Sequence, residues 1–163
     1  MVYSFGTDEY IESVVEKYSK TLLRIAFNIL HSTAESEDAV QDVMLSLITH
    51  APKFESEEHE KAWLIRATIN RAHNYVRARK RFQSGEELPD EPQYEDHERG
   101  ELLSAVLSLP EKYSVPVHLY YYEGYTTAQT AKILKLPVAT VCTRLSRARA
   151  RLRDMLDEQG GRK

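Results

Sequence analysis

The feature that most constrains the fold is the near absence of helix-breaking residues from long stretches of the chain. Neither glycine nor proline occurs in residues 7–51 or in residues 138–159. Proteins built from short strands need such residues at frequent turns, so this spacing favours long helices. Apolar residues make up 42% of the 163 residues, which is enough to form a core. We therefore expect an all-α protein.

Residues 83–100 interrupt this pattern and predict a division of the chain. The segment contains two glycines and two prolines among acidic and polar residues, and its apolar residues have no helical period. We interpret it as an acidic flexible linker. The two small helical domains that it joins would then cover residues 1–82 and residues 101–163.

Charge is distributed in blocks along the chain. Residues 61–85 contain seven basic and no acidic side chains, and residues 127–163 contain nine basic and three acidic ones. Acidic blocks precede them: residues 1–60 contain 12 acidic and four basic side chains, and residues 86–101 contain eight acidic side chains and one basic one. Each Lys or Arg close to a phosphate releases counterions, so two separate basic blocks predict two surfaces for a polyanion such as DNA. On charge alone, two solvated helix faces remain an open alternative.

The first domain is predicted to contain three helices. Apolar residues recur at helical spacing up to about His31, and a second helix follows until Pro52 stops it. Residues 53–60 are predicted to form a charged loop, and a long helix then runs from Lys61 into the basic run at residues 77–81. The basic block of this domain therefore lies on a helix.

The second domain is predicted to contain a helix-turn-helix. Thr126 is suited to cap a helix over residues 127–134, and a short turn at residues 135–137 leads into a last helix over residues 138–156. The tyrosines at positions 120–122 are expected in the core of the domain.

The last helix has the pattern of a DNA-recognition helix. Its inward stripe is apolar, with residues at steps of four, three and four: Val141, Leu145, Ala148 and Leu152. The opposite face carries small residues and arginines: Thr143, Ser146, Arg147 and Ala150 in the centre, and Arg144, Arg149, Arg151 and Arg153 on the flanks. Thr and Ser fit against base edges, and Arg forms paired hydrogen bonds to guanine or holds phosphates. Five arginines without an intervening acid repel one another unless an anion lies against them, which argues against a merely solvated face.

These motifs resemble those of the extracytoplasmic-function sigma factors of the bacterial sigma-70 family. The second domain is similar to region 4, which recognises the promoter −35 element, over Leu109-Pro110-Glu111, residues 119–125 and residues 140–149. The first is similar to region 2, which binds the polymerase clamp and recognises the −10 element, over residues 38–43 and residues 62–66 with Asn70. The resemblance covers nearly the whole chain. It implies a factor that directs core polymerase to promoters and assists promoter opening.

The resemblance also implies three sets of site residues. The polymerase-binding set lies on the second helix and comprises Asp38, Gln41, Asp42 and Leu45. The −10 set comprises Phe54 as a wall and Ala67 as the floor of a pocket for an unstacked base, Asn70 as the hydrogen-bond partner of that base, and Arg66, Arg71, Asn74, Arg77 and Arg81 as phosphate or duplex contacts. The −35 set comprises Cys142, Thr143, Ser146 and Arg147 at the bases, with Arg144 and Arg149 on the backbone. Without the resemblance, the acidic face of the second helix remains open as a solvated surface.

Cys142 departs from the family pattern. Family members often carry Lys or Arg at this position, and a thiol offers neither their charge nor their paired donors. The base preference at this position is therefore not implied by the resemblance.

No cofactor and no metal site are expected. Cys142 is the single cysteine, so no internal disulfide can form, and the six histidines are scattered without the spacing of a zinc or catalytic site. The chain has no apolar run of about 18 residues, so we expect no membrane insertion and a cytoplasmic location. The implied partners are core RNA polymerase, through its clamp and flap, promoter DNA and an anti-sigma factor.

Other classes of function remain as alternatives. A stand-alone helix-turn-helix regulator would explain the second domain but would leave the basic helix of the first domain without a purpose. A protein that merely sequesters a regulator would not support transcription. Association with core polymerase distinguishes both from a sigma factor, and an enzyme is not favoured.

Overall fold

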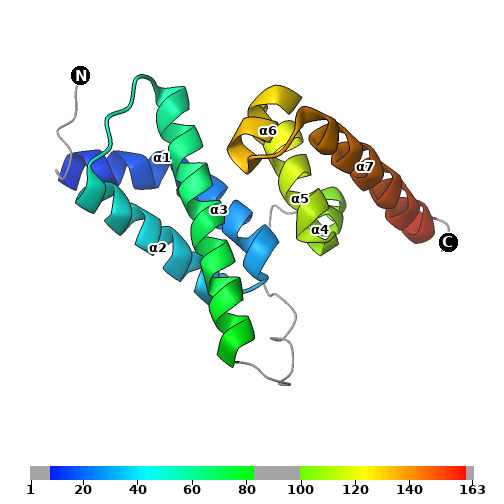
Figure 1. Cartoon of the computed structure of the whole chain (residues 1–163). Helices are drawn as coiled ribbons and strands as arrows, with labels where there is room; N and C mark the ends of the chain where they lie inside the picture. The colour runs from blue at the N-terminus through cyan, green and yellow to red at the C-terminus, as the bar shows by residue number, and fades with distance from the viewer. Residues whose placement is uncertain (1–7, 83–99, 161–163) are drawn as a thin grey trace. The chain divides into compact units, whose positions relative to one another are not determined.

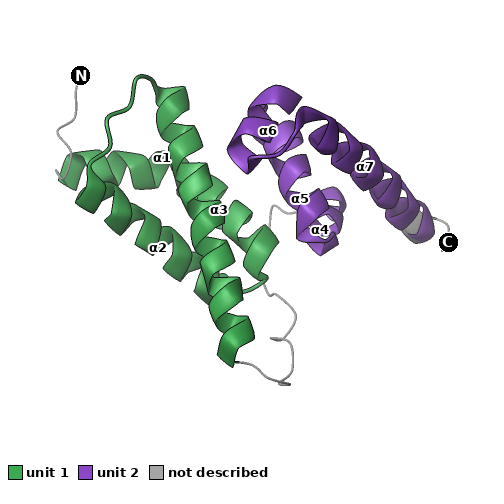
Figure 2. Cartoon of the chain, viewed as in Figure 1, with its two compact units in different colours: residues 1–94 green, residues 95–163 purple. Residues whose placement is uncertain are grey.

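The computed structural model describes residues 8–82 and 100–160, and every regular element in these ranges is a helix. The chain divides into two compact units, Met1–Tyr94 and Glu95–Lys163 (Figures 1 and 2). The predicted all-α class is confirmed. Nearly all of the predicted linker lies outside the described residues, so its flexibility and the domain boundaries stay predictions. Among the described helices, none has both the length and the apolar character needed to cross a membrane.

Unit 1 is built from three helices that pack against one another. Helix α1 spans Asp8–Leu30, α2 spans Thr33–His50 and α3 spans Glu57–Phe82. In Figure 1, α3 crosses in front of α1. All three helices contribute fully buried apolar side chains to the core, among them Leu22, Ile25, Phe27, Leu47, Leu64 and Ile65.

Helix α3 begins earlier than predicted, at Glu57 rather than Lys61. The Oγ of Ser56 accepts a hydrogen bond from the backbone N–H of His59 at 3.1 Å, as an N-capping side chain does. Three glutamates occupy the first turn, where carboxylates interact favourably with the helix macrodipole. The acids that were predicted to lie in a loop therefore start the helix, and the loop is reduced to residues 51–56.

Unit 2 is organised around its longest helix. Its elements are α4 (Glu101–Ser108), α5 (Glu111–Val117), the π-helical turn η1 (His118–Tyr122), α6 (Thr127–Leu134) and α7 (Val138–Gly160). Helices α4, α5 and α6 all pack against α7. The predicted inward stripe of α7 is confirmed, because its four members are buried in one core cluster with residues of the other helices: Val141, Leu145, Ala148 and Leu152.

The predicted helix-turn-helix is confirmed in α6 and α7. Thr126 and Gln129 form a reciprocal capping box, with side chain to backbone N–H bonds of 3.1 and 2.9 Å. Helix α6 ends at Leu134, and its C-cap residue Lys135 adopts the left-handed conformation with φ 56°. The carbonyl of Pro137 accepts the N–H of Val141 at 3.2 Å and so begins α7. Local hydrogen bonding thus fixes both ends of the turn.

The expectation that all three tyrosines lie in the core is wrong for Tyr121 and Tyr122. Pro116 has no N–H to donate, and the chain widens into η1 directly after α5. Successive residues of a helix point in directions about 100° apart, so three in a row cannot all face inward. Tyr120 packs against the core, whereas Tyr121 and Tyr122 are 52% and 39% exposed.

Candidate nucleic-acid interface

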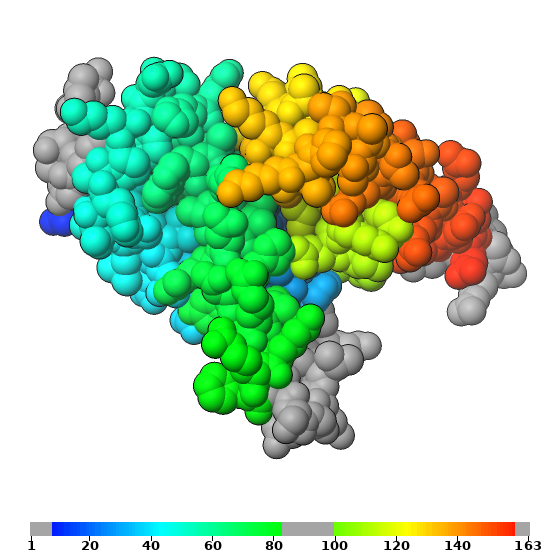
Figure 3. All heavy atoms as spheres, in the orientation of Figure 1, coloured from blue at the N-terminus to red at the C-terminus, as the bar shows by residue number. Residues whose placement is uncertain are grey.

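The outward face of α7 carries the residues predicted to recognise the −35 element. Arg144 is half-buried, and the other members are exposed: Cys142, Thr143, Ser146, Arg147 and Arg149. In the space-filling view, α7 forms a continuous ridge on unit 2 (Figure 3, orange to red). The Oγ1 of Thr143 donates to the carbonyl of Ala139 at 3.0 Å, so this hydroxyl keeps the capacity to accept a bond from a base.

Tyrosines of α5 and η1 hold the basic side chains that flank this face. The Nη1 of Arg149 donates to the hydroxyl of Tyr121 at 2.9 Å. The guanidinium of Arg151 lies 4.7 Å from the centroid of the Tyr113 ring, and the Nζ of Lys112 lies 5.1 Å from it, both within range of a cation–π interaction. The sequence prediction missed the bond between Arg149 and Tyr121 because it placed the tyrosine run in the core.

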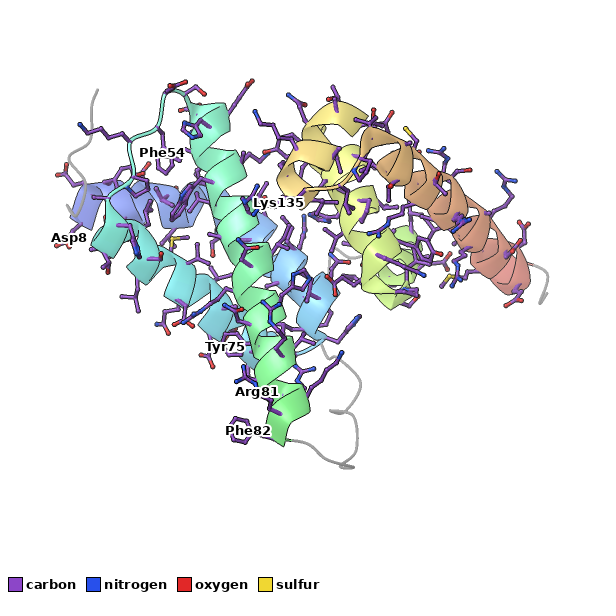
Figure 4. The ribbon with its side chains drawn as sticks, in the orientation of Figure 1. Asp8, Phe54, Tyr75, Arg81, Phe82 and Lys135 are labelled. Carbon is purple, nitrogen blue, oxygen red and sulfur yellow. The ribbon has the colours of Figure 1, made fainter. Side chains whose placement is uncertain are left out.

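The outward face of α3 carries most of the predicted −10 set. Arg66 and Ala67 are half-buried, and the remaining members on this helix are exposed: Asn70, Arg71, Asn74, Arg77 and Arg81. Positions 67, 70, 74, 77 and 81 are three or four residues apart and so form one stripe. Within it, the Nη2 of Arg77 donates to the Oδ1 of Asn74 at 2.7 Å. Figure 3 shows α3, in green, along the visible face of unit 1, and Figure 4 labels Arg81 near its end.

Phe54 lies in the loop that precedes the first turn of α3 (Figure 4). Its ring packs edge-on against His59 and Trp63, with centroid distances of 5.4 and 5.7 Å. The Nδ1 of His59 accepts the backbone N–H of Glu55 at 3.1 Å and so ties the loop to the first turn of α3. Trp63 is half-buried rather than a full member of the core. The loop is thus held by aromatic packing against the first two turns of α3, on the N-terminal side of the stripe.

One residue of the basic run on α3 points inward. The Nη2 of Arg79 donates to the carbonyl of Leu30 at 3.3 Å and also forms an ion pair with Glu35. The last carbonyls of a helix lack partners within it, so Arg79 completes the end of α1. Its side chain is only 19% exposed. The sequence could not distinguish Arg79 from its neighbours because this partner lies 49 positions away.

The predicted polymerase-binding residues lie on the exposed side of α2, with one exception. Asp38 and Gln41 are exposed, and Leu45 is 57% exposed. Ile48, three positions further on, is 42% exposed and extends the apolar part of this face, although the prediction did not include it. Asp42 is half-buried instead, because it faces α3.

Asp42 contacts a residue of the predicted DNA-binding set. Its Oδ2 accepts hydrogen bonds from the Nε of Arg71 and from the hydroxyl of Tyr75, both at 3.0 Å. Burial, followed by the bond to Asp42, raises the pKa of Tyr75 above its ordinary value, so its hydroxyl keeps its proton further into the alkaline range. Two residues predicted for different partners are therefore joined within one unit.

Comparisons with known proteins identify both units. A family model described as "Sigma-70 region 2" matches residues 14–82, and one described as "Sigma-70, region 4" matches residues 99–152. The RNA polymerase sigma-E factor of Streptomyces coelicolor is 32% identical, over 89% of this chain and 85% of that protein. The ECF RNA polymerase sigma factor SigW of Bacillus subtilis is 22% identical, over 93% and 91%.

A solved structure has the same fold. The sigma factor RpoE of Bartonella quintana, in complex with the anti-sigma factor NepR, matches with a TM-score of 0.69 at 22% identity, over 93% of this chain and 98% of that one. The family models cover unit 1 and unit 2 in the order in which the sequence motifs occur. The chain belongs to the extracytoplasmic-function sigma factors of the sigma-70 family, and it is an RNA polymerase sigma factor rather than an enzyme.

Proposed function

We propose that α7 lies in the major groove of the −35 element. Thr143, Ser146 and Arg147 would contact base edges, while Arg144 and Arg149 would hold phosphates on either side. The observation that carries this proposal is the outward face of α7, where small residues lie between arginines and Arg149 is held at the edge by Tyr121. Small central side chains permit close approach to the bases.

Unit 1 would recognise the −10 element with the stripe on α3 and the loop that carries Phe54. Unstacking a base costs a few kcal/mol, and stacking on an aromatic ring with hydrogen bonding to an amide recovers part of that cost. Exposed Asn70 would supply the amide, Ala67 one turn before it on the stripe would line the floor, and Phe54, held by Trp63 in the preceding loop, would supply the aromatic wall. Arg77 and the other basic residues would follow the phosphates.

The exposed side of α2 would dock on the clamp of core polymerase through Asp38, Gln41 and Leu45. Leu45 would bury apolar surface against the partner, while Asp38 and Gln41 would pair with basic and polar groups of the partner and so fix the register of the two surfaces. The exposed tyrosines of η1 would face the flap. An anti-sigma factor would cover these surfaces when the protein is held inactive in the cytoplasm, as the similarity to a sigma factor bound to NepR suggests.

Run-off transcription with purified core polymerase on genomic fragments tests the proposal. We expect defined transcripts that depend on this chain, and promoters with shared −35 and −10 elements. A chain that bound DNA specifically but neither associated with core polymerase nor directed initiation would instead be a stand-alone regulator. The transcription assay with Arg147→Ala and Asn70→Ala then assigns each element to its unit.

A further inference from the structure

The contact between Asp42 and Arg71 joins the two faces of unit 1. Asp42 lies on α2, and the Nε of Arg71 reaches it from α3 over 3.0 Å. The hydroxyl of Tyr75, one turn further along α3 and labelled in Figure 4, donates to the same oxygen; this bond is 3.0 Å long. The carboxylate of Asp42 therefore accepts two hydrogen bonds from α3, and the bond to Arg71 fixes the direction in which that side chain extends from the helix.

Arg71 stands at the border of the DNA-facing stripe. It follows Asn70 directly and is therefore turned about 100° from it, towards α2. Its side chain is 47% exposed, whereas that of Asp42 is 29% exposed. A guanidinium has several N–H donors, so the bond through Nε leaves capacity for a phosphate. Without a carboxylate at its side, this long side chain would sample many rotamers before it met DNA.

We infer that Tyr75 and Asp42 are positioning residues that orient Arg71 towards the −10 strand. The inference rests on the proposed function of α3, and it gives Asp42 an internal role as acceptor beside its predicted place in the polymerase-binding set, which stays a prediction. Tyr75 belongs to none of the three predicted site sets. It acts on the DNA only through the carboxylate that it shares with Arg71.

A double-mutant cycle on the holoenzyme tests this. Tyr75→Phe removes one hydroxyl and leaves the ring in place, and Arg71→Ala removes the positioned group. The measurement is the affinity of full-length holoenzyme for a fluorescent single-stranded −10 oligonucleotide. We expect Tyr75→Phe to weaken binding by about 3- to 10-fold in the wild-type background and by less than about 1.5-fold in the Arg71→Ala background.

Tyr10→Phe is the matched control. Its hydroxyl, on α1, donates to Glu60 in the first turn of α3 at 2.7 Å, so the substitution removes a tyrosine–carboxylate bond at a point on α3 distant from Arg71. Its effect on affinity should be equal in both backgrounds. Unfolding midpoints of all variants show that each chain folds.

The outcomes separate the inference from the proposed function. An effect of Tyr75→Phe that persists in full without Arg71, or no effect in the wild-type background, would overturn the inference. If Asn70→Ala abolished binding while Arg71→Ala had no effect, the −10 surface would stand and the positioning role would not. A wild-type holoenzyme that binds no −10 strand would refute the proposed function itself.

Discussion

Arg147→Ala and Arg149→Ala should separate base recognition from phosphate contact on α7. The two residues are two positions apart, so their side chains leave the helix in directions that differ by about 200°. Arg147 lies beside Ser146 in the centre of the outward face, and Arg149 lies at its edge, bonded to Tyr121. We expect Arg147→Ala to weaken specific binding by about 1–3 kcal/mol, or about 5- to 150-fold, and to relax the preference at one base pair.

Arg149→Ala should behave differently because a phosphate contact carries no sequence information. One lost contact reduces the slope of log K against log salt by about 0.9. Between about 50 and 200 mM salt, that difference amounts to about 0.5 log unit, or about 3.5-fold. The advantage of the wild type over Arg149→Ala should therefore shrink about 3.5-fold across this range, whatever the −35 sequence.

The assay is fluorescence anisotropy of holoenzyme on promoter duplexes that each carry one substituted −35 base pair, at several salt concentrations. Arg153→Ala serves as a control of the same type, since Arg153 is exposed near the end of the same helix. If Arg147→Ala lowered the affinity for every duplex by the same factor, Arg147 would not contact a base. A change in base preference from Arg149→Ala would refute its assignment to the backbone.

Further substitutions test the other parts of the molecule. Asn70→Ala should reduce promoter melting, measured with a fluorescent base in the −10 element, while −35 duplex binding stays intact; unchanged melting would remove Asn70 from the site. Leu145→Ala, at 2% exposure in the core of unit 2, should lower the free energy of unfolding in urea by about 2–5 kcal/mol, and a loss below 1 kcal/mol would mean that the core repacks around the space. Arg79→Ala should lower the free energy of unfolding by roughly 1–3 kcal/mol and leave the salt dependence of DNA binding unchanged. Arg77→Ala should leave the free energy of unfolding unchanged and reduce the salt dependence of DNA binding. Burial, then the bond to Glu60, raises the pKa of Tyr10, so stability should be complete below the ordinary tyrosine pKa of about 10 and decline as the pH rises above it. Tyr10→Phe should flatten this alkaline decline, and an equally steep decline in the variant would assign it to other groups.

The parts of the fold that depend on local pattern could be predicted from the sequence. Leu145 and its neighbours recur at helical spacing, and the capping side chain of Thr126 sits directly before its helix. These signals involve residues within one or two turns of each other. The all-α class and the helix-turn-helix followed from them.

The parts that depend on packing between helices could not be predicted in this way. Asp42 and Arg71 lie 29 positions apart, and nothing in either helix alone shows that they meet. Tyr121 was misplaced because three consecutive tyrosines of a helical turn cannot all face inward, and the sequence alone did not show which of them meets α7 and the rest of the core. The start of α3 was misplaced because a run of acids is compatible both with a loop and with a first helical turn. In the candidate site, residue types were predictable but their partners were not.

The partners decide how much of each basic block is available to DNA. Seven basic side chains lie in residues 61–85, and a count of charges alone would let each release a counterion. Arg79 instead neutralises Glu35 inside unit 1, and Arg71 shares its charge with Asp42. Both pairs already exist before DNA binds, so their contribution to the salt dependence is smaller than that of an unpaired cation. The salt slope of −10 recognition should therefore be shallower than the sequence suggests, and the arginines that remain exposed, such as Arg77 and Arg81, should account for most of it.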